Sequence, residues 1–172
     1  MFPSPITIAN EHDLSAFDCG KTALNEFLVK YALTNNNAGI ARTYVVTLPN
    51  QPSVIAYYSI AAGSVEREKA SDRAAKGVPR SPVPVALIAR LAVDLKCQRK
   101  GLGAGMLKHA LQQILNASNT IGIRAVLVHA KDDEAAKFYR GYGFEPTPVN
   151  ALHLMLLLKD VKKTLGITAA QT

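Results

Sequence analysis

The first regular pattern along the chain is an apolar stripe with helical spacing near the N-terminus. Its four members recur at positions i, i+3, i+4 and i+7, the spacing of one helix face: Leu24, Phe27, Leu28 and Tyr31. The pattern predicts a helix over about residues 21–33, with Asp18 just upstream, where its side chain could cap the free amides. Three asparagines at 35–37 and Gly39 then interrupt the pattern and predict the end of the helix.

Two β-rich runs follow, at residues 42–48 and 54–61. The segment between them contains two prolines, so the pair predicts an antiparallel hairpin. Residues 66–77 are polar and alternate in charge, which is compatible with a short helix or a mobile loop. Prolines between positions 79 and 84 predict an extended approach to the next strand.

A strand, a glycine-rich loop and a helix then come in direct succession. Residues 85–93 are apolar and compatible with a strand, apart from Arg90, and residues 94–105 are rich in glycine and basic residues. A helix is predicted from there to about Asn116. Its apolar positions predict the following buried side: Met106, Leu107, Ala110, Leu111, Ile114 and Leu115.

The remaining elements are a strand at 124–129, a short helix at 132–140 and a last strand at 152–158. Acidic residues open the short helix, where they complement the helix dipole. The order of elements mixes helices and strands around one core, which predicts an α/β (α+β) fold. No linker composition interrupts the chain, so we expect a single domain over residues 1–172.

Composition narrows the class of protein. The chain has 172 residues, of which 48% are hydrophobic, as is usual for a globular protein. Its longest apolar runs are too short to span a bilayer, and its N-terminus lacks the pattern of a secretion signal, so we expect a soluble intracellular protein. Cys19 and Cys97 stand singly and far apart, which predicts neither a metal site nor a disulfide framework and suits a reducing cytoplasm.

Positive charge is concentrated in one part of the sequence. The formal net charge is +7, and residues 66–108 contain ten basic residues against four acidic ones. A basic surface attracts phosphates, whether of a coenzyme or of a nucleic acid. A solvated basic face without a partner is the alternative interpretation.

The glycine-rich loop is the first segment that indicates a chemistry. Glycines let backbone amides approach a ligand, and the first amides of a helix are unpaired and electropositive, so the loop predicts a site for a diphosphate. A P-loop would need Gly-Lys-Ser/Thr, which the chain lacks, and a dinucleotide fingerprint would need a glycine where Met106 stands. The segment Gln98-x-x-Gly101-x-Gly103 instead resembles the pyrophosphate loop of GNAT acetyltransferases, Gln/Arg-x-x-Gly-x-Gly/Ala.

A second segment resembles the same superfamily. Residues 135–146 match the pattern Ala-x-x-Phe/Leu-Tyr-x-x-x-Gly-Phe, and they follow the strand after the loop and helix, as in GNAT proteins. The resemblance implies a GNAT fold, with a mixed central sheet of about six or seven strands and about four helices. It also implies that Tyr139 lies near the coenzyme sulfur. A lone tyrosine on a short helix is otherwise a core aromatic residue.

More of the chain is similar to one branch of the superfamily, the tRNA-acetylating toxins of bacterial toxin–antitoxin pairs. The similar segments include 17–28, 42–45, 57–59, 82–94 and 128–131, and only about the last dozen residues fall outside the resemblance. The resemblance implies acetylation of the amino group of aminoacyl-tRNA, a block of translation, a separate ribbon-helix-helix antitoxin and a toxin homodimer.

The same resemblance assigns roles to individual residues. The strand backbone would hold the pantetheine arm of acetyl-CoA, at Leu91, Ala92 and Val93. The loop would hold its pyrophosphate, through Gln98, Arg99, Lys100, Gly101, Leu102, Gly103 and Ala104. Tyr139 would act as general acid toward the leaving thiolate. From their charge and position, the residues expected to contact tRNA phosphates are Arg73, Lys76, Arg80, Arg90 and Lys96.

Other roles and functions stay open at this point. His129 could serve as a base, although a strand histidine is more often structural, and Cys97 could form an acetyl-enzyme only if a base activated it. A GNAT enzyme that acetylates a small amine or a protein N-terminus is one alternative function. A non-catalytic module that binds acetyl-CoA or a nucleic acid is the other.

Overall fold

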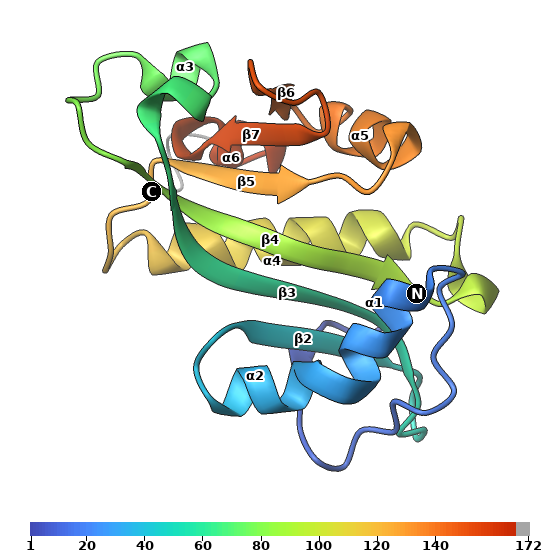
Figure 1. Ribbon diagram of the computed structural model, residues 1–172. Coiled ribbons are helices and arrows are strands. Elements are labelled where there is room, and N and C mark those ends of the chain that lie inside the picture. The colour runs from blue at the N-terminus through green and yellow to red at the C-terminus, as the bar shows by residue number, and fades with distance from the viewer. Residues whose placement is uncertain (168–172) are drawn as a thin grey trace. The chain divides into compact units, whose positions relative to one another are not determined.

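A computed structural model describes residues 1–167, and within them seven strands form one mixed sheet in the order β1-β2-β3-β4-β5-β7-β6 (Figure 1). The strand number agrees with the expectation of six or seven. The chain divides into two compact units, one made of Met1–Ala61 and Ala89–Ala110, the other of Ala62–Ile88 and Leu111–Thr172. The single domain predicted over residues 1–172 stays a prediction, and its last positions, 168–172, lie outside the described residues.

In the first unit, the predicted N-terminal helix is continuous but longer and less regular than its pattern indicates. It consists of α1 (Thr22–Phe27), a π-helical turn (Leu28–Ala32) and α2 (Leu33–Asn37). The helix ends where the asparagines and Gly39 predict, at Asn37, with Gly39 in the left-handed region at φ 74°, so it runs about four residues beyond the expected end near residue 33. The Asn36 side chain is buried, and its Oδ1 accepts a hydrogen bond from the Thr43 amide at 3.0 Å. The asparagine is thus paired with the following strand.

Two further details of this helix differ from the prediction. Tyr31 is 55% exposed, while Leu28 and Ala32 are fully buried. The π turn adds a residue to the helical repeat, so the stripe moves from Tyr31 to Ala32. Asp18 does not cap α1, since the capping position is Lys21, and Asp18 Oδ1 instead accepts from the Gly20 amide at 2.8 Å.

The predicted hairpin is confirmed as β2 (Arg42–Thr47) and β3 (Val54–Val65), paired antiparallel with Val45 opposite Tyr57. Tyr57 is buried in the core of the first unit, and its hydroxyl donates to the Leu24 carbonyl at 2.7 Å, which ties the N-terminal helix to the sheet. A strand that the pattern did not predict, β1 (Ile6–Thr7), pairs with β2. Both of its residues are exposed, so the strand has no alternation of buried and exposed positions from which it could be predicted.

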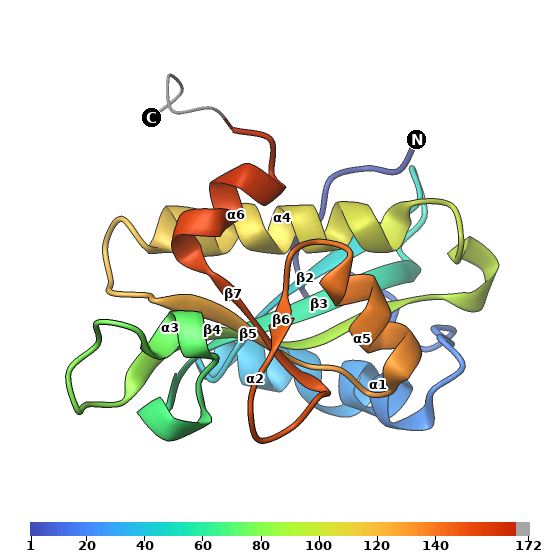
Figure 2. The ribbon, with the colours of Figure 1, turned by 90° about the horizontal axis from the view of Figure 1, so that it is seen from above.

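The second unit contains the C-terminal strands. The first part of β4 (Val83–Val93) is parallel to β5 (Ala125–His129), and β5 is antiparallel to β7 (His153–Leu157). A two-residue strand that was not predicted, β6 (Glu145–Pro146), completes this edge of the sheet. The apolar run predicted as a strand to residue 158 divides at Leu158, because α6 (Leu158–Thr164) begins there directly after β7 (Figure 2).

Helices connect these strands. The segment 66–77 forms a 3₁₀ turn (Arg67–Lys69) and α3 (Asp72–Ala75), within the range of the prediction. The predicted acidic start of α5 (Asp133–Arg140) is confirmed, since Asp132 caps it by accepting from the Ala135 amide at 2.8 Å. The helix after the glycine-rich loop is α4 (Leu102–Ala117). Its predicted face is buried as follows: Met106, Leu107, Ala110, Leu111 and Ile114 fully, and Leu115 partly.

Candidate coenzyme loop and acetyl-transfer residues

The loop after β4 is anchored at its start by two side chains. The Asp94 carboxylate is buried and accepts the amides of Asp18 at 3.0 Å and Lys96 at 2.9 Å. The Gln98 amide group donates to the carbonyls of Val93 at 2.9 Å and Cys19 at 3.2 Å. These four bonds hold the beginning of the loop against the end of β4 and against the turn before α1. The Gln98 side chain therefore binds the protein's own backbone, which its place in the motif did not reveal.

The backbone of the loop turns through two left-handed residues before α4 begins. Arg99 has φ 60° and Gly101 has φ 83°. The Gly105 amide donates to the Gly101 carbonyl at 3.1 Å, which closes the first helical turn. The amides of Leu102, Gly103 and Ala104 precede that bond and belong to the positive end of a 16-residue helix. This arrangement can bind an anion.

Of the two motif glycines, Gly101 has a conformational reason to be glycine and Gly103 has none. Gly101 needs it for its positive φ, since a Cβ at that position would meet no atom within 4 Å. At Gly103 a Cβ would lie 3.8 Å from Val93 Cγ2, which is an ordinary contact. The open space beside Gly101 and the adjacent helix amides fit a diphosphate group, which is the part of acetyl-CoA that this loop would hold.

Three cations flank the loop, and they differ in whether their side chains are free in solvent or bonded to the protein. Arg99 is exposed, and Lys100 folds back so that its Nζ donates to the Lys96 carbonyl at 2.9 Å. The Lys96 side chain is exposed. The positive charge predicted for this loop is therefore present at its surface.

The last residues of β4 lie next to the loop in the same unit. Ala92 is buried, and Leu91 and Val93 are half-buried. In the described part of the chain, the ladder between β4 and β5 ends at the pair Ile88 and Val128, so the backbone of 91–93 takes no part in it. The structure thus brings all of the residues predicted to bind acetyl-CoA together in the first unit.

Tyr139 lies on α5 in the second unit. Its side chain is 8% exposed, and its ring packs edge-on against Phe138 and Phe144 at centroid distances of 5.2 and 5.5 Å. Burial disfavours the phenolate and raises the pKa of Tyr139 to about 12. The Tyr139 carbonyl accepts the amides of Tyr142 and Phe144, which fixes the turn after α5. The residue is a neutral phenol at physiological pH and can donate a proton.

The five basic residues predicted to contact tRNA differ in their surroundings. The Arg90 guanidinium stacks over the Phe27 ring at 3.7 Å, and Arg73 forms ion pairs with Glu145 and Asp160. The side chains of Lys76, Arg80 and Lys96 are exposed. Arg90 and Lys96 belong to the first unit, and the other three belong to the second.

The alternative catalytic residues have structural surroundings. The His129 ring stacks on His153 with centroids 4.0 Å apart, and burial together with the His153 charge lowers the pKa of His129. The Cys97 thiol is buried. Within residues 1–167, no three His, Cys, Asp or Glu side chains gather closely enough to hold a metal ion. Every helix in that range is too short or too polar to cross a membrane.

Two features of this region have no equivalent in the sequence prediction. The buried Asp94 carboxylate organises the start of the loop, and an acidic residue directly after the strand was its only sequence signal. His153 lies opposite His129 across two paired strands, and no local pattern connects the two.

Known proteins resemble this chain over most of its length. Residues 53–146 match the acetyltransferase (GNAT) domain family. A tRNA-acetylating toxin of Mycobacterium tuberculosis (strain ATCC 25618 / H37Rv) is 40% identical over 165 residues, which cover 96% of this chain and 98% of the relative. A probable toxin TacT of Sinorhizobium fredii (strain NBRC 101917 / NGR234) is 28% identical and covers 91% of each chain.

Solved structures agree with these matches. AtaT in complex with acetyl-methionyl-tRNAfMet has a TM-score of 0.85 at 28% identity, covering 93% of this chain and 97% of its own. AtaTR bound with acetyl-CoA has a TM-score of 0.80 at 27% identity, covering 93% and 96%. The sequence and structural matches together show that the chain belongs to the GNAT acetyltransferase family and is a close relative of its tRNA-acetylating toxins.

Proposed function

We propose that the protein transfers the acetyl group of acetyl-CoA to the amino group of an aminoacyl-tRNA, and so blocks translation as the toxin of a toxin–antitoxin pair. The observation that carries the proposal is the 40% identity to a tRNA-acetylating toxin along almost the whole of both chains. The intact loop supports it, because an anion-binding helix start and a left-handed Gly101 are what a bound coenzyme diphosphate would require.

Two segments of the first unit would hold acetyl-CoA. The amides of Leu102, Gly103 and Ala104 would bind the pyrophosphate, and Arg99 and Lys100 would add positive charge beside it. Gln98 would contribute by fixing the loop through its two carbonyl bonds. The backbone of Leu91, Ala92 and Val93 would pair with the pantetheine arm in the manner of an added strand. Acetyl-CoA supplies the activated thioester.

Tyr139 is the proposed general acid. Departure of a thiolate is easier when a proton is donated to it, and the Tyr139 phenol carries a proton at neutral pH. The attacking α-amino group has an ordinary pKa of about 7.7–8.0, so a useful fraction is neutral near pH 7 without a protein base. Neither His129 nor Cys97 is needed in this scheme.

Basic residues would bind the tRNA. Lys76, Arg80 and Lys96 are exposed and can reach phosphates, and Arg73 and Arg90 were predicted with them. If phosphate contacts supply the affinity, binding should weaken steeply as the salt concentration rises. A salt-independent interaction would count against tRNA as the substrate.

Relatives suggest the partners. AtaT has been solved bound to the C-terminus of the antitoxin AtaR, and the AtaT–AtaR complex bound to DNA. We propose an antitoxin for this protein too, of the ribbon-helix-helix class, together with a toxin homodimer. A tRNA substrate also implies that the protein acts in the cytoplasm.

The decisive experiment incubates purified protein with labelled acetyl-CoA and total charged tRNA. Label on the aminoacyl group supports the proposal, and label only on a small amine or a protein N-terminus assigns a different acceptor. Tyr139→Phe should keep acetyl-CoA binding while lowering turnover. Unchanged turnover in that variant would remove Tyr139 from the chemical step.

A further inference from the structure

A short basic segment of the second unit, residues 66–81, is attached to the sheet by its apolar side. Ala70 and Ala74 are buried against β4, β5 and β7, next to Val85 and Met155. The Ser71 hydroxyl caps α3 by accepting the Ala74 amide at 3.3 Å. Helix α3 has only four residues, so these contacts alone leave its polar side and the following loop weakly held.

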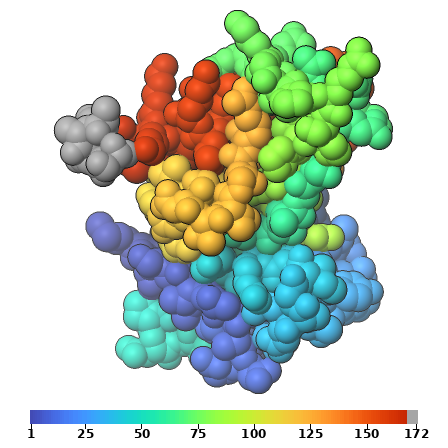
Figure 3. All heavy atoms as spheres, turned by 90° about the vertical axis from the view of Figure 1, so that its left-hand side faces the viewer, coloured from blue at the N-terminus to red at the C-terminus, as the bar shows by residue number. Residues whose placement is uncertain are grey.

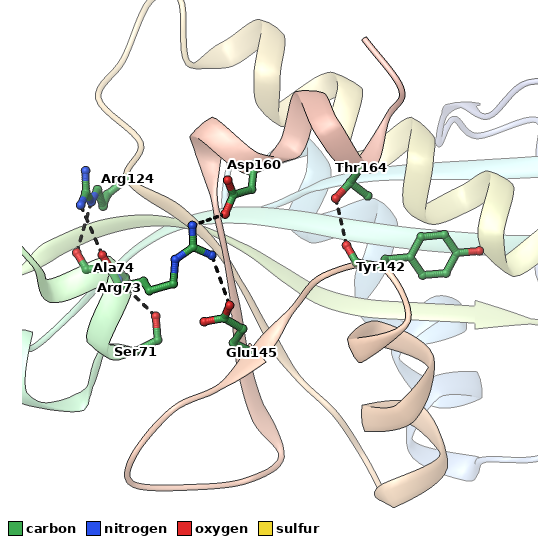
Figure 4. A network of polar contacts seen from close by, with 8 residues as sticks. All are labelled: Ser71, Arg73, Ala74, Arg124, Tyr142, Glu145, Asp160 and Thr164. Atoms are coloured by element: carbon green, nitrogen blue, oxygen red, sulfur yellow. Dashed lines mark hydrogen bonds and ion pairs between the residues drawn. The ribbon is translucent and has the colours of Figure 1, made fainter. Parts of the chain in front are cut away.

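Arg73 binds two carboxylates from other elements. Its Nη1 lies 3.2 Å from Glu145 Oε1 on β6, and its Nη2 lies 2.8 Å from Asp160 Oδ2 on α6. Figure 4 shows the guanidinium between the two acids. Because one positive charge faces two negative ones, this triad carries a formal charge of −1. The charge of Arg73 is therefore already balanced by its own partners before a tRNA phosphate approaches.

Arg124 holds the other end of the helix. Its side chain donates to the backbone carbonyls of Ala74 at 3.2 Å and Arg73 at 3.4 Å, as Figure 4 shows. It also donates to the Lys76 carbonyl at 3.1 Å, at the C-terminus of α3. Its backbone is itself fixed between Pro84 and Leu158. Arg124, which directly precedes β5, thus satisfies carbonyls at the end of α3. Its positive charge also interacts favourably with the negative end of the helix dipole.

Beyond this attachment, the segment presents exposed cations. Lys76 directly follows α3 and Arg80 lies four residues further on, and neither has a carboxylate partner in the part of the chain that the structure describes. In the space-filling view, long green side chains of this segment project from the surface beside the orange loop that precedes β5 (Figure 3).

We propose that Arg73 and Arg124 are positioning residues: they fix the segment 66–81 so that Lys76 and Arg80 meet tRNA phosphates, and Arg73 itself contacts no phosphate. This inference rests on the proposed function and assigns its substrate-binding surface more narrowly. Holding two cations in place before tRNA arrives reduces the entropy lost on binding. Ion pairs this exposed contribute little to overall stability, so variants of the triad should stay folded.

The test removes the acids that bind Arg73 while leaving the arginine. In the double variant Glu145→Gln with Asp160→Asn, a positioning role predicts that KM for total charged tRNA rises about three- to tenfold, the range that one or two exposed ion pairs can supply. KM for acetyl-CoA and kcat should be unchanged. If Arg73 instead binds phosphate, freeing it should lower the tRNA KM and steepen its salt dependence, which would overturn the inference.

Two controls separate charge from position. Glu11→Gln with Glu134→Gln also removes two exposed acids, neither of which forms an ion pair within the described residues, so it reports the effect of net charge. Arg73→Lys keeps the charge but lacks the planar guanidinium fork that donates to both carboxylates. Positioning predicts that Arg73→Lys raises the tRNA KM as much as Arg73→Ala does. A lysine variant that behaves like the wild type would contradict it.

Hydrogen exchange tests the inference independently of activity. Amides of residues 67–80 should exchange faster in Glu145→Gln with Asp160→Asn than in the wild type, and unchanged exchange would refute the role of the triad. Should the wild type fail to acetylate charged tRNA, the proposed function would fall, while the exchange experiment would still decide whether the triad orders the segment.

Discussion

Replacing Gly101 by alanine tests whether the coenzyme loop depends on its left-handed turn. The residue has φ 83°, and an added Cβ would meet no atom within 4 Å. The substitution therefore adds no clash, and its cost is the conformational one, about 1–2 kcal/mol for a non-glycine residue in the left-handed region. In a chain of this size, that corresponds to a fall in Tm of about 2–8 °C if the loop keeps its shape.

The same free energy can appear as lost affinity instead. If the strained loop relaxes to a negative φ, the fraction of molecules with a binding-competent loop falls by a factor of about 5–30, and the apparent Kd for acetyl-CoA rises by the same factor. We therefore expect Gly101→Ala to weaken acetyl-CoA binding about tenfold, with a small loss of Tm. Isothermal titration and differential scanning calorimetry measure the two quantities separately.

Gly39→Ala is the matched control. Gly39 has φ 74°, and a Cβ there would also meet no atom within 4 Å, but the residue follows α2, outside the loop. It should lose stability without losing affinity for acetyl-CoA. Equal affinities in the wild type and in Gly101→Ala would refute the reasoning, as would a loss of affinity shared by both variants.

Three further predictions concern other parts of the protein. Tyr58→Phe removes a hydroxyl 2.7 Å from His109 Nδ1, so unfolding in urea should show a loss of about 1 kcal/mol with acetyl transfer retained. Asp94→Ala leaves the amides of Asp18 and Lys96 without their acceptor, which should cost about 2–3 kcal/mol and raise KM for acetyl-CoA; an unchanged KM would show that the loop does not need this anchor. Burial raises the pKa of Tyr139 from 10.0 to about 12, so the folded state holds this proton more tightly, and the resulting stability is complete below pH 10 and is lost as the pH rises toward 12. Tyr139→Phe should therefore lose less stability than the wild type between pH 10 and pH 12 in guanidinium unfolding, and identical losses would place the tyrosine in a more solvated environment than the structure indicates.

Elements with a clear local pattern were predictable from the sequence. The hairpin of β2 and β3 and the buried face of α4 follow from alternation and helical spacing. The Asp132 cap of α5 follows from one residue type at one position. Two-residue strands such as β1 have no period to detect, and an apolar run of leucines does not show where β7 ends and α6 begins.

Contacts between distant residues were not predictable. Arg73 pairs with Glu145, 72 positions away, and Arg90 stacks on Phe27. In the sequence both arginines are simply part of a basic window, and nothing local distinguishes them from Lys76. Motif residues were easier to find than their anchors, since Gln98 fits a known pattern, whereas Asp94 holds the loop through the amides of Lys96 and of the distant Asp18.

The net charge of the chain thus overstates the charge that is available to a polyanion. Of the five cations predicted to contact tRNA, Arg73 is neutralised by two carboxylates and Arg90 is stacked on an aromatic ring, which leaves Lys76, Arg80 and Lys96. Each phosphate contact contributes a slope of about −0.7 to −0.9 to the dependence of log K on log salt concentration. Three contacts give a slope of about −2 to −3, and five would give about −3.5 to −4.5. The slope measured with charged tRNA therefore counts the contacts, and a value near −4 would mean that cations beyond Lys76, Arg80 and Lys96 also contact phosphates.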